Sequence, residues 1–166
     1  MLARVVILAA VVLVAVGALS GSGLLERLAP ALTEAAAPEP VPAQGPVVLE
    51  ADASGHYLVD ASVDGRPVRF VVDTGATRVA LSAETARRIG LAVDRSAFTA
   101  LTRTANGTVA AAPVVISEVR VGGARIADVD ALVLPEGALD VDLLGMSFLS
   151  RLAGFRVSGR QMVLSP

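Results

Sequence analysis

A four-residue stretch, Asp73-Thr74-Gly75-Ala76, places a carboxylate directly behind the apolar run 68–72, which has the composition of a buried strand. A carboxylate removed from water is costly unless it gains partners or shifts its pKa, so the fold must use Asp73. Gly75 permits a sharp turn and the close approach of a second segment. The Thr74 hydroxyl can cross-link the turn by hydrogen bonding. Together these residue types are what a catalytic carboxylate on a tight turn requires.

From Val47 onward the sequence predicts many short strands separated by turns. Three turn signals are Asp64-Gly65, Asn106-Gly107 and Gly122-Gly123. The expected strands are residues 57–63, 66–73, 98–103, 108–115, 115–121, 124–134, 155–157 and 162–164, the last two forming a closing hairpin around 158–160. This spacing favours an all-β barrel or closed sandwich.

Two short helices are expected among the strands. Residues 82–90 form the clearer one, because Ser82 is a good N-cap and Gly90 can end the helix. Glu84 lies in its first turn, and the two arginines 87 and 88 lie in its last turn, where each charge suits the helix dipole. Residues 146–152 predict the second helix. The fold class is therefore all-β with one or two short helices.

Composition excludes several kinds of site. The net charge of −2 and the lack of a basic stripe argue against a nucleic-acid partner. The chain has no cysteine and a single histidine, His56, so we expect no metal and no cofactor, and we expect His56 at the surface or at a strand edge. The lone histidine and the absence of a Gly-x-Ser-x-Gly elbow exclude Ser147 from a serine triad.

Four aspartates have a spacing that could suggest calcium. They form two pairs, 128 with 130 and 140 with 142, whose members are two residues apart. No Asp-x-Asp-x-Asp-Gly loop of the kind that binds calcium accompanies either pair. We therefore expect solvated strand edges and turns at Asp128, Asp130, Asp140 and Asp142.

The first 46 residues predict two further segments. Residues 1–22 contain the apolar run 5–19 behind Arg4, which is long enough for a transmembrane anchor of ~20 residues, and a cleaved signal peptide is the alternative. Residues 23–46 are rich in proline and alanine and predict an extended linker. Residues 47–166 form the globular domain. The positive charge at the start favours a cytoplasmic N-terminus.

The chain resembles the retropepsin-like aspartic proteases (clan AA), and in particular their bacterial, membrane-anchored, single-domain members with an Asp-Thr-Gly-Ala motif. The resemblance rests on residues 70–77 with 79–82, on the Leu-Leu-Gly segment within 143–149, and on 104–108. It runs from about residue 55 to residue 164. It implies a retropepsin-like closed β-barrel, here preceded by an N-terminal transmembrane helix.

The resemblance also implies roles for individual residues. Asp73 is the expected catalytic carboxylate, Thr74, Gly75 and Ala76 shape its loop, and Leu143, Leu144 and Gly145 support that loop from behind. The family's flap hairpin falls on Thr104, Ala105, Asn106, Gly107 and Thr108. From the local residues alone, a plain surface hairpin is equally consistent with this segment.

One Asp-Thr-Gly in a domain of this size has a chemical consequence. Amide hydrolysis without metal, cysteine or activated serine can use two carboxylates that share one proton. We therefore expect a homodimer in which the two copies of Asp73 face each other across a two-fold axis. The strand pair 155–157 and 162–164 is available for the interface, and retropepsin dimers often interleave their termini.

The sequence therefore predicts an aspartic endopeptidase that cuts extended protein or peptide segments. It would be a single-pass inner-membrane protein with a periplasmic catalytic domain, or a periplasmic protein if a signal peptide is removed. The alternative is a non-catalytic dimerisation or peptide-binding module at the membrane, because the fold alone does not specify the activity.

Overall fold

The computed structural model describes residues 45–91, 93–104 and 107–166, all within one compact unit. The elements in this part of the chain are β1 (Val47–Glu50), β2 (Leu58–Val63), β3 (Arg66–Val72), β4 (Val79–Ser82), α3 (Ala83–Arg88), the 3-10 turn η1 (Arg95–Ala97), β5 (Ala100–Thr104), β6 (Gly107–Val121), β7 (Ala124–Leu134), β8 (Asp142–Leu144), α4 (Met146–Leu149), β9 (Gly154–Ser158) and β10 (Gln161–Ser165).

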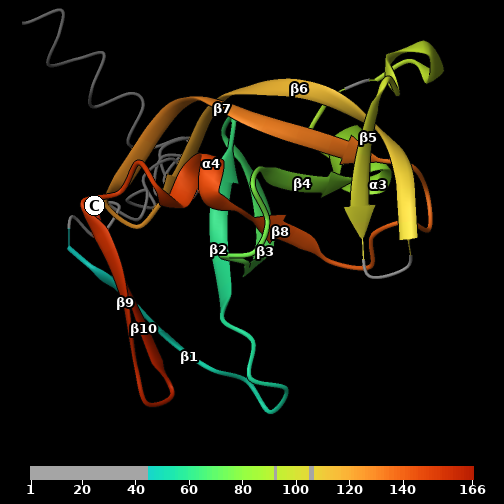
Figure 1. Ribbon diagram of the computed structural model, residues 1–166. Helices are drawn as coiled ribbons and strands as arrows, with labels where there is room; N and C mark the ends of the chain where they lie inside the picture. Colours follow the sequence, from blue (N-terminus) through green and yellow to red (C-terminus); the bar gives the residue numbers. More distant parts are fainter. Residues whose placement is uncertain (1–44, 92, 105–106) are drawn as a thin grey trace, which may run out of the picture. The chain divides into compact units, whose positions relative to one another are not determined.

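The main sheet is a closed barrel (Figure 1). Its strand order is β2-β3-β8-β4-β7-β6-β5, and β2 also pairs with β6, which closes the ring. The pairs β3–β8 and β4–β7 are parallel, while β8 also pairs antiparallel with β4. This confirms the predicted all-β barrel with few short helices. The central position of β8 brings residues 142–144 beside the end of β3.

The barrel interior is mostly aliphatic, since the whole chain has only four phenylalanines and one tyrosine. Its largest fully buried side chains are Phe70, Phe148, Leu81, Ile116 and Leu144. Burying each such side chain contributes about 1.5–3 kcal/mol, so the alternating valines and leucines of the strands supply most of the stabilisation.

A second sheet, of three strands, was only partly predicted. The expected closing hairpin forms as β9 and β10 around Gly159 and Arg160. The strand β1, which the sequence analysis did not single out, pairs antiparallel with β10, giving the order β1-β10-β9 (Figure 1). The side chains of Leu49, Met162 and Leu164 join this sheet to the main core.

The helix α3 and its caps match the prediction. The Ser82 hydroxyl accepts a hydrogen bond from the Thr85 amide at 3.1 Å. At the other end Gly90 has a φ of +83°, and the amide of Leu91 donates to the carbonyl of Ala86 at 2.8 Å. This arrangement is a Schellman cap, which a glycine at this position favours.

Two predicted boundaries were wrong. The helix expected over 146–152 ends at Leu149, because the following residues turn toward β9. The strands expected over 108–115 and 115–121 form one strand, β6. Ile116 and Val119 are both fully buried, although residues three apart face opposite sides of a regular strand. The alternation is interrupted beside Asp128 on β7, which has a φ of +50° and is absent from the β6–β7 register between Ala127 and Val129.

Residues 1–22, and all but the last two residues of 23–46, lie outside the described residues. Within 45–91, 93–104 and 107–166, no helix combines the length and the apolar character needed to cross a membrane.

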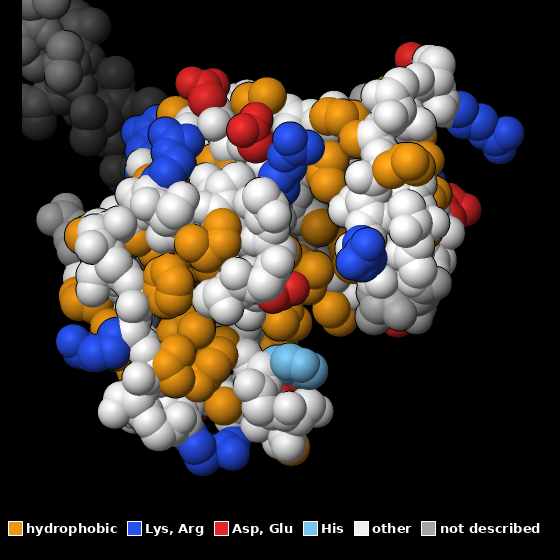
Figure 2. Space-filling model, in the orientation of Figure 1, with side chains coloured by type: hydrophobic (Ala, Val, Ile, Leu, Met, Phe, Trp, Pro, Cys, Tyr) orange, Lys and Arg blue, Asp and Glu red, His pale blue; other side chains and the backbone are white. Residues whose placement is uncertain are grey.

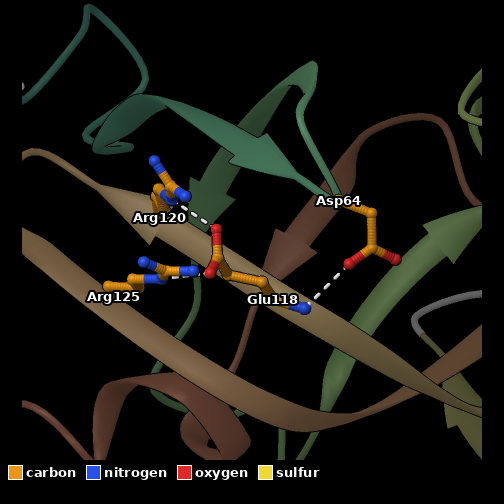
Figure 3. A network of polar contacts seen from close by, with 4 residues as sticks. All are labelled: Asp64, Glu118, Arg120 and Arg125. Carbon is orange, nitrogen blue, oxygen red and sulfur yellow. Dashed lines mark hydrogen bonds and ion pairs between the residues drawn. The ribbon is translucent and has the colours of Figure 1, made fainter.

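The turn Asp64-Gly65 closes the barrel as well as the hairpin that the sequence predicts. Its two residues have φ values of +47° and +80°, as a two-residue turn of type I′ requires. The Asp64 amide donates to the Glu118 carbonyl at 3.0 Å, and the Asp64 carboxylate accepts from the Glu118 amide at 2.8 Å (Figure 3). These two bonds extend the short β2–β6 pairing beyond Val63 and Val119.

Glu118 also forms ion pairs with two arginines that face each other across β6 and β7. Its carboxylate accepts hydrogen bonds from Arg120 and Arg125, which are directly opposite in the strand register (Figure 3). Like charges in such a pair are otherwise destabilising. The hydrogen bond from Arg120, reinforced by Arg125, holds the pKa of Glu118 below its ordinary value of 4.5.

This lowered pKa predicts a pH dependence of stability. Glu118 stabilises the fold fully above the unfolded-state pKa of 4.5, and this contribution is lost as the pH falls through the lower folded-state pKa. Glu118→Gln should therefore lose less unfolding free energy than the wild type between about pH 7 and about pH 3. Urea unfolding measures the free energies of the wild type and the variant at each pH. The difference between the two proteins should be smaller at high salt than at low salt. Parallel pH curves for the two proteins would contradict this role.

Candidate active site

Asp73 lies on a tight turn at the end of β3. Its amide donates to the Leu144 carbonyl at 3.1 Å, which continues the parallel β3–β8 pairing by one residue. Its carboxylate accepts a hydrogen bond from the Gly75 amide at 2.8 Å, and the Ala76 amide donates to the Asp73 carbonyl at 3.3 Å. The side chain is half-buried. The turn thus orients a single carboxylate whose other oxygen is unoccupied by these bonds.

Residues 74 and 75 are exposed at the tip of this turn. A Cβ on Gly75 would lie 3.2 Å from the Asp73 carboxylate oxygen Oδ1, tighter than most contacts allow. The Thr74 hydroxyl makes no hydrogen bond to any residue in the described part of the chain. The Thr74 hydroxyl and one oxygen of the Asp73 carboxylate therefore remain available to bind another molecule.

The segment 143–145 lies directly against the Asp73 turn. Leu144 is fully buried, and Leu143 pairs with Val71 on one side and Ala80 on the other. A Cβ on Gly145 would lie 2.2 Å from the carbonyl oxygen of Arg78, which only the absence of a side chain permits. The Leu-Leu-Gly pattern therefore combines buried strand residues with one position at which two backbones touch.

Ser147 has a structural role that the sequence did not predict, since it was weighed there only as a possible nucleophile. Its hydroxyl accepts a hydrogen bond from the Val79 amide at 2.9 Å and donates one to the Asp130 carbonyl at 2.7 Å. Its amide donates to the Thr77 carbonyl at 3.0 Å. Ser147 thus ties the segment after the Asp73 turn to β7. Its place two residues after Gly145 was the signal available in the sequence.

Asp142 corrects the prediction that all four aspartates are solvated. It is 7% exposed, and it accepts hydrogen bonds from the Ser82 amide at 2.8 Å and the Thr85 hydroxyl at 2.6 Å. The reason is that β8 lies between β3 and β4, where the start of α3 supplies donors. Asp128, Asp130 and Asp140 are exposed, as expected.

A groove of about 740 Å³ opens in front of the Asp73 turn. One wall is apolar and includes Leu132, Leu134 and Leu143, while β5 forms the opposite wall. Figure 2 shows this hollow, with hydrophobic side chains in its floor. A groove that combines apolar side chains with a few polar groups and an oriented carboxylate is a typical site for an organic ligand.

The hairpin predicted at Asn106-Gly107 is present. Strands β5 and β6 pair antiparallel up to Thr104 and Gly107, and the Thr104 hydroxyl donates to the Gly107 carbonyl at 3.0 Å. Gly107 has a φ of +116°, and Thr108 is exposed at the start of β6. Ala105 and Asn106 lie outside the described residues. In the described part of the chain β5 pairs only with β6, and its residues 100–104 line the groove.

The groove carries charges of both signs. Besides Asp73 it is lined by Asp140, Arg78 and Arg103, all three exposed. His56 is exposed before β2, as expected, and Arg69 lies outside the groove, where it pairs with Asp60 at 3.8 Å.

Comparison with known proteins assigns this architecture to a family. The family described as gag-polyprotein putative aspartyl protease matches residues 59–151. The crystal structure of a retropepsin-like aspartic protease from Rickettsia conorii is similar, with a TM-score of 0.64 and 34% identity over 72% of this chain and 89% of that one. The chain belongs to the retropepsin-like aspartic protease family.

Two curated relatives extend the comparison. An uncharacterized protein in the cobV 5′ region of a Sinorhizobium species is 43% identical over 109 residues, which is 66% of this chain and 47% of that protein. An uncharacterized protein of Rickettsia prowazekii (strain Madrid E) is 34% identical over 121 residues, or 73% and 52% respectively. The chain therefore spans about half the length of the curated relatives it matches.

The contact at Gly145 gives a stability prediction. Gly145→Ala should lower the free energy of unfolding by about 1–3 kcal/mol or more, because a Cβ there overlaps the backbone of Arg78. Chemical denaturation measures the change. Gly154→Ala is the matched control, since nothing lies within 4 Å of a Cβ at that position, and it should cost no stability. Equal stability of the two variants would show that the close approach is unimportant.

Proposed function

We propose that this protein is an aspartic endopeptidase that hydrolyses peptide bonds in extended protein segments. The observation that carries the proposal is the Asp73 carboxylate, fixed by the Gly75 amide at the side of the groove. Family membership supports a proteolytic activity.

The chemistry requires a second carboxylate. In a pair sharing one proton, the ionised carboxylate takes a proton from water, whose oxygen attacks the amide carbon. The protonated carboxylate donates to the carbonyl oxygen, which gives a tetrahedral diol. Its C–N bond then breaks as the first carboxylate passes the proton taken from water to the amine nitrogen and the second carboxylate accepts a proton from a diol hydroxyl. We propose that the second carboxylate is Asp73 of another copy of the chain.

A homodimer is supported by the exposed tip of the Asp73 turn and by the three-stranded sheet. The outer edge of β9 pairs with no strand in the described part of the chain. Phe155 and Val157 on β9 are 38% and 52% exposed, on the sheet face that elsewhere covers the core. Figure 2 shows hydrophobic side chains gathered over this region. An exposed apolar edge strand is a ready template for pairing with a second copy.

The groove suits an extended substrate. The free edge of β5 can pair with a peptide strand, while the β5–β6 hairpin acts as the flap that screens the carboxylates from bulk water. The leucines of the opposite wall provide space for aliphatic side chains of the substrate.

We also propose an inner-membrane location with the catalytic domain in the periplasm. The apolar run within residues 1–22 and the proline-rich linker 23–46 support it. Tethering would raise the effective concentration of the domain and favour its dimer.

Substitution of Asp73 tests the activity. Asp73→Asn in the full chain should abolish cleavage of a diverse peptide library, read by mass spectrometry, because the amide cannot accept a proton from water. Asp140→Asn is the matched control, since Asp140 is the other carboxylate in the groove, and it should retain cleavage. Unchanged cleavage by Asp73→Asn would favour another mechanism. Loss of cleavage in Asp140→Asn would indicate a dyad within one chain, and no cleavage by the wild type would favour a non-catalytic binding module.

Substitution of Val157 tests the assembly. Val157→Asp should weaken dimerisation by more than about tenfold and lower activity at limiting concentration, because each copy would bury an unpaired carboxylate. Analytical ultracentrifugation measures the dimerisation, and assays over a range of protein concentrations measure the activity. Val115→Asp is the control, since Val115 is similarly exposed (57%) but lies on β6. Full activity in a strictly monomeric Val157→Asp protein would rule out the proposed dimer.

A further inference from the structure

Arg78 carries a positive charge on a rigid part of the groove. Its carbonyl touches Gly145, and the next amide, of Val79, is held by the Ser147 hydroxyl at 2.9 Å. Val79 itself is fully buried. Arg78 therefore lies on a backbone that is fixed on both sides, five residues after Asp73, and this exposed residue lines the same groove as Asp73.

This guanidinium has no carboxylate partner among the described residues. The ion pairs there join Arg69 to Asp60, Arg87 to Glu136, and the pair Arg120 and Arg125 to Glu118. Asp140 and Asp73 line the groove, and Asp130 shares a smaller neighbouring hollow with Arg78, but none of them pairs with it. The charge is thus solvated and available when the groove is empty.

A peptide lying in the groove would change this situation. Covering an unpaired guanidinium removes water from it, which is unfavourable unless the ligand supplies an acceptor of opposite charge. The planar fork of arginine matches a carboxylate in a two-pronged hydrogen bond, and bonds of this kind are strong and directional. The leucines of the apolar wall can accept the neighbouring aliphatic side chains.

We propose that Arg78 is a specificity-determining residue that binds a carboxylate of the peptide in the groove. This inference rests on the proposed protease function and names its substrate class: extended segments that carry a carboxylate at one set position near an aliphatic residue. Arg78 selects the peptide and takes no part in proton transfer. The carboxylate can belong to an internal Asp or Glu or to a peptide C-terminus.

Arg103 lines the same groove but lacks this support. It lies on β5, one residue before Thr104 at the end of the β5–β6 pairing. Among the described residues no hydrogen bond joins its backbone to the Asp73 turn, so its position depends on the hairpin.

The first experiment is cleavage of a peptide library by the full-length protein, with amidated and free C-termini in separate arms. The wild type should prefer Asp or Glu over Asn or Gln at one position, or a free over an amidated C-terminus, by about tenfold. Arg78→Glu should abolish the preference and favour Lys or Arg there. Arg66→Glu changes the net charge equally, outside the groove, and should leave the preference unchanged. An acidic preference that survives in Arg78→Glu, or no preference in the wild type, overturns the proposal.

The second experiment separates this inference from the proposed activity. Binding of fluorescent acidic and matched amide peptides to Asp73→Asn is measured by anisotropy, with and without Arg78→Glu. Asp73→Asn alone should bind the acidic peptide about tenfold more tightly than the matched amide peptide, and this difference should shrink at high salt. The double variant should bind the two peptides equally. Equal affinities overturn the role of Arg78 even if the protein cuts peptides. Tighter acidic binding without any cleavage by the wild type overturns the protease function instead. Unchanged thermal unfolding of Arg78→Glu confirms that it is folded.

Discussion

The contact between β8 and the Asp73 turn is the constraint on which the rest of the structure depends. The Leu144 carbonyl accepts the Asp73 amide, and the Gly145 backbone lies against the carbonyl of Arg78. Because β8 is inserted between β3 and β4, these contacts exist only when the barrel is formed. The geometry of the carboxylate is therefore coupled to the stability of the barrel.

The same arrangement accounts for the two sides of the groove. On one side, the hydroxyl of Ser147 and the buried Val79 hold the segment that follows Asp73. On the other side, β5 is an edge strand whose hairpin ends beside the groove. A rigid wall next to a hairpin with a free edge suits a ligand that is itself extended, because its backbone can pair with the hairpin while its side chains contact the wall.

A single carboxylate in this setting also connects the site to assembly. The chain belongs to a family of aspartic proteases, and the described residues hold one Asp-Thr-Gly turn. The turn is exposed at its tip, and the three-stranded sheet has an apolar edge at β9 that pairs with no described strand. The proposed symmetric dimer would cover both features, and it would link the proposed activity to protein concentration.

Local features of the fold were predictable from the sequence. The turn at Asp64-Gly65, the cap at Ser82 and the hairpin before Gly107 depend on residues within a few positions of each other, so the sequence pattern predicts them directly. The tight turn at Asp73 was likewise predictable, because the requirement for Gly75 arises from its neighbour in the chain.

Contacts between distant segments were decided by the tertiary structure. The burial of Asp142 depends on donors from Ser82 and Thr85, which lie about sixty residues earlier in the chain. The continuity of β6 depends on pairing with β7, and β1 is a strand only because β10 lies beside it. The sequence by itself determined the residue types and the local turns that make a carboxylate usable. Only the closed barrel decided which segments touch that turn, since long-range pairing is set by the packing of the whole core and leaves no periodic signal in either segment.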